Sequence, residues 1–264
     1  MPSPLKFYNL VANKGCSSPF FSPPCARVHV ALLAKHVPFE LVEVTYSDLR
    51  SQHWRDKLGV HKATAPFVER EDATFLMDSF AIAKWLDEAY RDRPSLFLPE
   101  APVPVDVGSV PYVAALERYK AFEKTCAAGL GPDFKLFAPI LIRRFDPETA
   151  AYWSSDARLG DGVWDSVDAA TEQDKAESVK AVQRFLTQLS NDHLLDGRLF
   201  ISSATKPGME DFFLFSHYRL LRAVSASLAA ELFETPASGS CKAWLDRVHK
   251  LYPLEEARAR DPST

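Results

Sequence analysis

The sequence predicts a protein in two parts, an α/β domain followed by an all-helical (all-α) domain. Strand and helix patterns alternate over residues 5–90, whereas strand patterns nearly vanish beyond the linker and helical periodicity dominates. Between the two lies a segment with Pro94, Pro99, Pro102 and Pro104, which cannot continue a helix and suits a semi-rigid linker. We therefore expect an α/β domain at 1–92, a proline-rich linker at 93–107 and an all-helical domain at 108–264.

The α/β domain is predicted from the order of its strand and helix patterns. The patterns predict a strand at 5–11, a helix at 24–36, a strand at 39–46, a polar helix at 47–58, strands at 67–70 and 74–77, and a helix from Ser79, which we expect to cap it. In that last helix Ile82, Trp85, Leu86 and Ala89 form one apolar stripe. The predicted order is βαβαββα.

The second half carries helical periodicity in four long segments, 110–130, 171–190, 209–230 and 240–252. The segment 133–168 is less regular, and we expect helix with loop insertions there.

Composition and the absence of certain motifs argue against several classes of partner and cofactor. Apolar residues make up 47% of the 264 residues, the net charge is −4 and the pI is about 6.0, so we expect neither nucleic acid nor a membrane surface as a partner. The four cysteines form no CxxC, which indicates reduced intracellular thiols. No signal peptide or membrane span is evident, so the protein is expected to be soluble and cytoplasmic. The histidines show no HExxH, and GxGxxG and P-loop motifs are absent, so we expect no metal and no nucleotide cofactor.

Three local features of the α/β domain suggest a ligand site. The dipeptide Ala65-Pro66 precedes a strand; if its peptide bond is cis, Ala65 can pair its backbone with an extended peptide, and the alternative is a trans proline starting an edge strand. Asp78-Ser79 begins a helix, whose N-terminus attracts a carboxylate while Asp78 meets an ammonium; the alternative is a simple cap. Ser22 also begins a helix, where its hydroxyl either caps the helix or stabilises a thiolate.

The order and spacing of these features resemble the glutathione-binding, thioredoxin-like domain of glutathione transferases. The shared pattern is Ser-Pro-x-x-x-Arg at 22–27, x-Pro before a strand, and Asp-Ser-x-x-Ile-Ala-x-x-Leu at 78–86. The block 77–94, with Gly15-Cys16 ahead of Ser22, looks most similar to the etherase-like branch, which includes bacterial lignin β-etherases and fungal etherase-related transferases. The resemblance is specific over 5–98 and architectural beyond. In the helical half, 207–212 resembles the family's helix-starting motif, with Gly208 where Ser or Thr is usual and a structural role implied for Asp211.

The resemblance implies a site for glutathione as co-substrate. Its γ-glutamyl end would lie at Asp78 and Ser79, its cysteine backbone at Ala65 beside Pro66, and its thiol at Ser22. The glycine carboxylate needs a cation near the second helix, for which Lys62 is the first choice and His61 the second.

Other residues compete with Ser22 for the thiol. Ser17 and Ser18 form a second Ser-Pro in the same loop, and Tyr8 stands where some transferase classes use a tyrosine. Omega-like relatives use a cysteine, but Cys25 lies off the motif position and is expected to be a buried thiol, whereas Cys16 could be a redox handle.

The resemblance also implies the reaction. A serine-stabilised thiolate would attack aromatic or apolar electrophiles, including aryl ethers, in a pocket between the domains that we expect to be lined by Phe20, Phe21, Tyr112 and Tyr119. The alternatives are a ligandin-type carrier of hydrophobic or polyphenolic compounds and a non-catalytic interaction module. Members of the family usually form homodimers, and Val110, Val113 and Leu116 give weak support to a dimer here.

Overall fold

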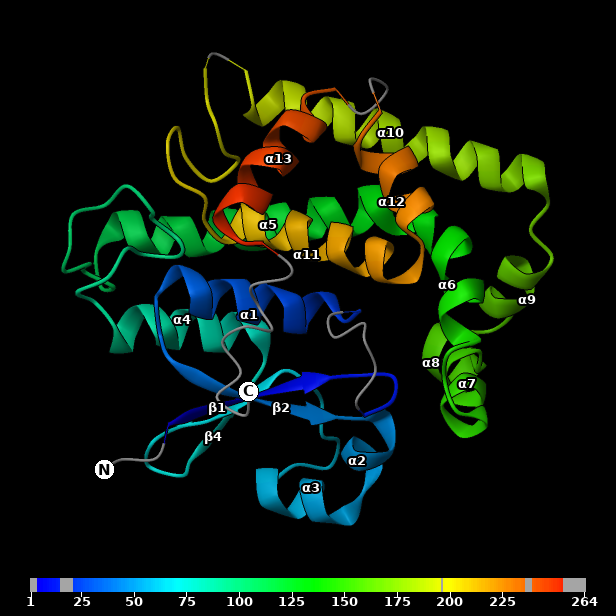
Figure 1. Cartoon of the computed structure of the whole chain (residues 1–264), viewed down its shortest axis with the longest axis horizontal. Coiled ribbons are helices and arrows are strands. Elements are labelled where there is room, and N and C mark those ends of the chain that lie inside the picture. The colour runs from blue at the N-terminus through cyan, green and yellow to red at the C-terminus, as the bar shows by residue number, and fades with distance from the viewer. Residues whose placement is uncertain (1–3, 15–20, 196, 236–238, 254–264) are drawn as a thin grey trace.

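A four-stranded mixed sheet forms the centre of the first domain (Figure 1). The computed structural model describes residues 4–14, 21–195, 197–235 and 239–253. The strands lie in the order β2-β1-β3-β4, with β1 parallel to β2 and antiparallel to β3, and β3 antiparallel to β4. Their bounds are β1 (Leu5–Leu10), β2 (Phe39–Val44), β3 (Phe67–Glu69) and β4 (Phe75–Met77).

The register of the strands brings three chain segments to one edge of the sheet. Tyr8 of β1 pairs with Phe67 of β3, and Phe67 pairs with Met77 of β4. Because these pairs are antiparallel, the end of β1, the start of β3 and the end of β4 lie together. The residues that follow β1 and β4, and those that precede β3, therefore emerge at the same place.

Four helices cover the sheet. Helices α1 (Pro23–Ala34) and α4 (Ser79–Ala89) lie between the sheet and the second domain, and α2 (Tyr46–Arg50) and α3 (Gln52–Leu58) lie at the opposite side (Figure 1). The expected single helix at 47–58 is instead two helices. Ser51 ends α2 with an extended backbone and caps α3, where its hydroxyl accepts a hydrogen bond from the Trp54 N–H at 3.4 Å. The cap of α4 is also corrected, because Asp78 caps it and Ser79 is its first helical residue.

All regular elements in the described residues of the second domain are helices. Its elements are α5 (Val110–Leu130), the 3-10 helix η1 (Gly131–Asp133), α6 (Phe134–Ile142), α7 (Pro147–Trp153), α8 (Asp156–Leu159), α9 (Val163–Asp168), α10 (Glu172–His193), α11 (Met209–Val224), α12 (Ala226–Phe233) and α13 (Cys241–Leu251). The segment expected as one helix at 209–230 divides at Ser225, whose hydroxyl caps α12. The irregular segment 133–168 consists of short helices joined by turns. These elements confirm the expected fold class, a thioredoxin-like α/β domain followed by an all-α domain.

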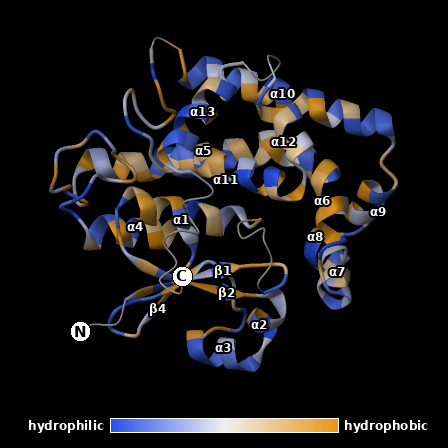
Figure 2. Cartoon of the chain, viewed as in Figure 1, coloured by the Kyte–Doolittle hydropathy of each residue, from blue (hydrophilic) through white to orange (hydrophobic). Residues whose placement is uncertain are grey.

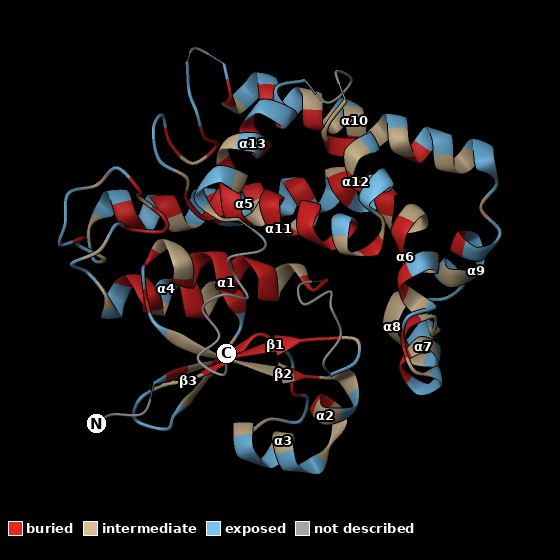
Figure 3. Cartoon of the chain, in the orientation of Figure 1, coloured by how far each residue is buried: buried red, intermediate tan, exposed pale blue. Residues whose placement is uncertain are grey.

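The two domains pack through α1 and α11. Helix α11 runs through the middle of the second domain and is buried along most of its length (Figure 3). Apolar residues gather on these inner elements, whereas the outer side of α10 is largely hydrophilic (Figure 2). Arg27 of α1 crosses the interface: its Nη1 lies 2.6 Å from Glu123 Oε1 and donates to the Tyr119 hydroxyl, and its guanidinium packs 4.5 Å from the Phe213 ring centre. A buried arginine with these partners orients the domains.

A buried ion pair holds the start of the linker. Lys35 Nζ lies 2.7 Å from Asp87 Oδ1, and both side chains are fully buried. The same carboxylate accepts hydrogen bonds from the Ser95 hydroxyl at 2.7 Å and from the Leu96 N–H at 2.9 Å. The linker is therefore anchored to α1 and α4.

Asp211, at the start of α11, is a second buried carboxylate that accepts several hydrogen bonds, as Asp87 does. Its buried carboxylate accepts hydrogen bonds from the backbone N–H groups of Ile201, Ser202 and Gly208 and from Trp244 Nε1. A Cβ atom on Gly208 would lie 2.7 Å from the Leu96 carbonyl oxygen and 2.8 Å from Ser202 Oγ. The close approach of the linker therefore leaves little room for a side chain at position 208.

One helical stretch of the described chain, Val110–Ile142, is long and apolar enough to cross a membrane by length and composition. It comprises α5, η1 and α6, and it packs against α10 and α11. A third of its most apolar window (33%) is buried, so one face of the stretch belongs to the core of the helical domain.

Candidate functional site

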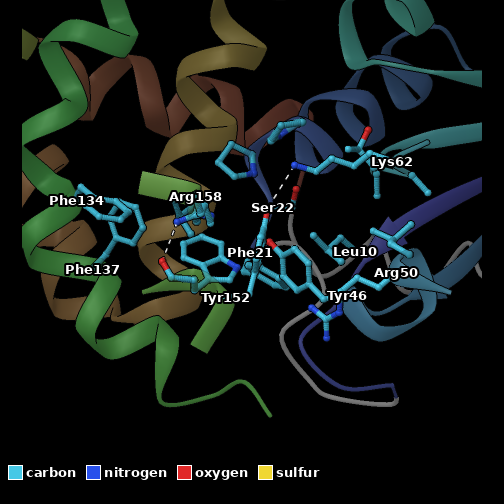
Figure 4. A pocket seen from close by; sticks show the side chains of 18 of the residues that line it. Leu10, Phe21, Ser22, Tyr46, Arg50, Lys62, Phe134, Phe137, Tyr152 and Arg158 are labelled. Carbon is cyan, nitrogen blue, oxygen red and sulfur yellow. Dashed lines mark hydrogen bonds between the residues drawn. The ribbon is translucent and has the colours of Figure 1, made fainter. Parts of the chain in front are cut away.

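A cavity of about 630 Å³ lies between the two domains. The first domain contributes the end of β1, the start of α1, parts of α2 and α3, and the loop before β3, and the second contributes α6, α7, α8 and α11. Figure 4 shows Phe134 and Phe137 on the helical side and Lys62 and Arg50 on the other, with Ser22 and Phe21 between them. The cavity therefore brings residues of both domains around the Ser22 side chain.

Ser22 occupies the N-cap position of α1 without acting as a side-chain cap. It is 8% exposed, its backbone carbonyl accepts the first helical hydrogen bond from the Ala26 N–H at 2.9 Å, and its side chain accepts no capping hydrogen bond from a described backbone N–H; its hydroxyl lies instead within hydrogen-bond reach of the Cys25 thiol. Pro23 and Pro24 follow and have no N–H groups, so two of the four donors that a helix start leaves unpaired are missing. The hydroxyl is thus a principal donor at this end of α1.

Cys25 lies behind Ser22 and is fully buried. Burial raises the pKa of its thiol to about 11, although the Ser22 hydroxyl and the Leu10 N–H, 3.5 Å from its sulfur, both favour the thiolate. A thiol with this pKa is protonated at neutral pH and is a poor nucleophile.

The loop before β3 supplies the next part of the site. The Ala65–Pro66 peptide bond is cis, the form that our interpretation of this dipeptide required, and Ala65 lines the cavity while Pro66 is buried behind it. Lys62 and His61, the two candidates for the glycine carboxylate, also line the cavity. Lys62 Nζ lies 3.3 Å from the Tyr152 hydroxyl of α7.

Asp78 and Ser79 lie beside the cavity rather than in its wall. They follow β4 at the sheet edge from which Ala65 and Pro66 lead into β3. Asp78 has φ +78°, a region that residues other than glycine rarely adopt and that occurs often at functional sites. Its Oδ1 accepts a hydrogen bond from the Ala81 N–H at 2.9 Å, and Ser79 is 8% exposed.

The expected aromatic lining is partly corrected. Phe21 lines the cavity, and Phe20 lies outside the described residues. Tyr112 and Tyr119 are fully buried elsewhere: the Tyr112 hydroxyl lies 3.3 Å from Asp87 Oδ2, and Tyr119 meets Arg27. Both face the core of the interface, and no residue of α5, a helix described in full, lines the cavity, which the apolar spacing of α5 could not show.

The aromatic wall comes instead from the segment 133–168 and from α2. It consists of Tyr46, Phe134, Phe137, Tyr152 and Trp153. Sequence reasoning missed these residues, and their clustering in an otherwise irregular segment was the one signal that could have found them. Burial raises the pKa of Tyr46 to about 12, so its phenol is neutral near pH 7.

The cavity is cationic although the chain is acidic overall. Arg50, Arg55, Lys62 and Arg158 line it, and its described lining contains neither aspartate nor glutamate. Arg50 and Arg55 were not anticipated. This charge suits a ligand with one or more carboxylates.

His217 of α11 also lines the cavity, where a buried carboxylate orients its ring. Its Nε2 lies 2.5 Å from Asp133 Oδ2 of η1, and Asp133 is 2% exposed. In the described part of the chain no three His, Cys, Asp or Glu side chains gather as a metal site.

The competing thiol partners are placed as follows. The Tyr8 hydroxyl donates to Glu69 Oε2 at 2.7 Å, its ring stacks on Phe67, and burial raises its pKa, so it packs within the sheet. Ser17, Ser18 and Cys16 lie outside the described residues.

Comparison with known proteins adds a family match for the first domain. Residues 19–94 match the family model described as glutathione S-transferase, N-terminal domain. No curated protein matches the chain in sequence.

Solved structures resemble the whole chain. A glutathione S-transferase of Ceriporiopsis subvermispora in complex with glutathione has 17% identity and a TM-score of 0.74, covering 96% of this chain and 99% of its own. Glutathione transferase GSTFuA3 from Phanerochaete chrysosporium has 18% identity and a TM-score of 0.72, with coverages of 96% and 99%. The Tau class glutathione S-transferase from mango has 16% identity and a TM-score of 0.63, with coverages of 99% and 97%. The chain therefore has the glutathione transferase fold, and its first domain matches the N-terminal domain of that family.

Proposed function

We propose that the protein is a glutathione transferase in which Ser22 stabilises the glutathione thiolate for attack on aromatic or apolar electrophiles. The observation that carries the proposal is the position of Ser22, at the start of α1 and in the wall of the cavity between the domains, with a side chain that is not used as a helix cap. Each domain supplies one half of this cavity, which suits a reaction between two substrates.

Glutathione fits the first-domain half by charge. Its γ-glutamyl ammonium would meet Asp78, and the neighbouring carboxylate would accept a hydrogen bond from Ser79 at the start of α4. Its cysteine backbone would pair with Ala65, and its glycine carboxylate would meet Lys62, with Arg50 and Arg55 close along the same wall. The thiol would then lie at Ser22.

Thiolate stabilisation in this arrangement depends on few donors. Because Pro23 and Pro24 remove backbone N–H groups from the first turn, the Ser22 hydroxyl carries much of the stabilisation. One hydrogen-bond donor to a developing or full anion is worth about 2.7–4 kcal/mol in enzymes that have been tested by mutation. That is enough to lower the pKa of the bound thiol substantially.

The acceptor half is aromatic and suits a ring-bearing electrophile. The thiolate sulfur would form a bond to the electrophilic carbon, and the leaving group would depart with the electron pair of the bond that breaks. With an aryl ether as acceptor, the carbon–oxygen bond breaks and the phenolate takes up a proton. We propose aryl ether cleavage as one such reaction on the strength of the aromatic wall and the resemblance of 77–94 to the etherase-like branch.

Titration calorimetry with glutathione and a conjugation assay with a chloronitrobenzene test the proposal together. We expect saturable glutathione binding and conjugation that requires it. Absence of binding at millimolar glutathione would contradict the proposal.

A carrier of hydrophobic or polyphenolic compounds is the second candidate. It is favoured by the size of the cavity, about 630 Å³, and by its aromatic wall, which can hold an apolar compound without chemistry. A carrier would bind hydrophobic dyes equally well with and without glutathione and would show negligible conjugation.

The resemblance to glutathione transferases also supports a homodimer that acts in the cytoplasm in detoxification. Val110 is 82% exposed and Val113 is 50% exposed, both on α5. Light scattering should give twice 29.5 kDa for a dimer, whereas a mass of 29.5 kDa would contradict it.

A further inference from the structure

Arg158 is a cation on the acceptor side of the cavity without a described counter-ion. It projects from α8, and its guanidinium lies 3.7 Å from the ring centre of Trp153. Its Nη1 donates a hydrogen bond to the Trp153 carbonyl oxygen at 3.2 Å, and no described carboxylate forms an ion pair with it. Partial burial lowers the pKa of Arg158 although the neighbouring Tyr46 and Tyr152 raise it, so this charge is partly desolvated.

The other cations of the cavity are arranged differently. Arg50 Nε pairs with Glu148 Oε1 at 3.2 Å. Arg55 and Lys62 belong to the first-domain wall; Arg55 contacts Gln52 of the same helix, and Lys62 contacts Tyr152 of α7. Arg158 comes from the second domain and lies on the wall opposite the proposed glutathione site. Its charge is therefore free to meet the second ligand.

The surroundings of Arg158 are aromatic. Tyr46 and Tyr152 lie close to its guanidinium, and Trp153 forms a tilted contact with Phe145 at 5.3 Å between ring centres. A flat ring can pack in this wall, while a group on its edge reaches the guanidinium. Because a desolvated cation strongly favours an anionic partner, that group should be negatively charged.

We propose that the acceptor half of the cavity is a site for aromatic carboxylates, in which the ring packs among Tyr46, Tyr152 and Trp153 and the carboxylate pairs with Arg158. Binding of an aromatic carboxylate at this site does not depend on the transferase proposal. A preference for acidic substrates in catalysis does rest on that proposed function. The site then selects acidic aromatic acceptors over neutral ones of the same shape.

Binding is tested with two ligands of nearly the same shape, the anion naphthoate and the neutral naphthamide, by titration calorimetry in the absence of glutathione. We expect the wild-type chain to bind the carboxylate at least about tenfold more tightly, the usual scale of a charge-assisted hydrogen bond. Arg158→Gln should remove this preference, and Arg158→Lys should keep part of it. Arg184→Gln is the matched control, because Arg184 is exposed on α10, away from the cavity, and changes the net charge equally.

Turnover is tested with a chloronitrobenzoate and the corresponding chloronitrobenzamide. In both, the glutathione sulfur forms a bond to the ring carbon that bears chlorine, and chloride leaves with the electron pair. Rates are divided by those of the uncatalysed reaction with glutathione, and we expect the carboxylate to be favoured in the wild type and in Arg184→Gln but not in Arg158→Gln.

The two proposals fail in different ways. Equal binding of naphthoate and naphthamide by the wild type would overturn the carboxylate site even if conjugation proceeds and even if Arg158→Gln fails to fold. A preference that persists in folded Arg158→Gln would overturn the role of Arg158. If the chain prefers naphthoate to naphthamide but binds no glutathione, the carboxylate site is supported and the transferase proposal is contradicted.

Discussion

Lys62 and Tyr152 meet across the cavity, with the Lys62 ammonium nitrogen 3.3 Å from the Tyr152 hydroxyl. The contact joins the loop before β3 in the first domain to α7 in the second. A ligand carboxylate at Lys62 would therefore share its ammonium with a residue of the acceptor wall, which connects the two halves of the site.

Lys62→Gln should weaken glutathione binding, because the glycine carboxylate loses a charged partner. The expected loss is about 1.5–3 kcal/mol, measured by titration calorimetry. Tyr152→Phe is the matched control, since it removes the other member of the contact, keeps Lys62 and should bind glutathione at least as tightly as the wild type. Unchanged affinity in Lys62→Gln would assign the carboxylate to His61 or to one of the cavity arginines instead.

Asp78→Asn should weaken glutathione binding without destabilising the fold. Asparagine keeps a side-chain oxygen to cap the Ala81 N–H, but it loses the charge that would pair with the γ-glutamyl ammonium. Ser79→Ala should cost about 1–3 kcal/mol of binding, because a ligand carboxylate loses a hydrogen bond. Calorimetry and melting curves separate the two effects, and a lowered melting temperature with intact affinity would show that the pair is structural only.

The first domain could be predicted largely from local patterns. The run rich in valine and aromatic residues at 39–46 and the apolar stripe from Ile82 to Ala89 each determine one element, since both depend on neighbours within the segment. The division of 47–58 at Ser51 and the cap at Asp78 were not anticipated, because capping depends on backbone angles that the pattern does not contain.

The acceptor wall could not be predicted in the same way. Tyr112 and Tyr119 have helical apolar spacing, and that spacing is equally satisfied by a core between domains, which is where they lie. Arg158 and Trp153 come from short helices that depend on tertiary contacts rather than on local periodicity. The first-domain half of the site could be predicted because each of its three motifs is a short local pattern, whereas the second-domain half is assembled from several distant helices.

The described cysteines should be unreactive in the native protein. Burial raises the pKa of Cys25 and of Cys241 to about 11 and raises that of Cys126 further, so thiolate is scarce at pH 7 and access is blocked. In a Cys16→Ser variant, which leaves these three thiols, an aromatic disulfide reagent should react slowly until denaturant is added. A thiol that reacts rapidly in the folded variant would reopen the cysteine mechanism.

Gly208→Ala should destabilise the chain by about 1–3 kcal/mol, because the new Cβ would approach the Leu96 carbonyl and Ser202. Gly108→Ala is the matched control: a Cβ atom added there would meet only Asp106 Oδ1 within 4 Å, at 3.4 Å, so its free energy of unfolding should change little. Urea unfolding measures both. Equal stabilities for the two variants would show that the linker moves away from α11 at little cost.

The pKa of the glutathione thiol bound to the wild type and to Ser22→Ala tests the central claim most directly. It is measured from the ultraviolet absorbance of the thiolate and from the pH dependence of conjugation. Loss of the Ser22 hydroxyl should raise this pKa towards its solution value and slow conjugation near neutral pH by roughly ten- to a thousandfold, about 1.4–4 kcal/mol. Higher pH should partly restore the rate, glutathione affinity should change little, and Ser22→Cys should shift activity towards thiol exchange. Tyr8→Phe, which removes the rival hydroxyl, should leave the thiol pKa unchanged. An unaltered thiol pKa and pH–rate profile in Ser22→Ala would contradict the account.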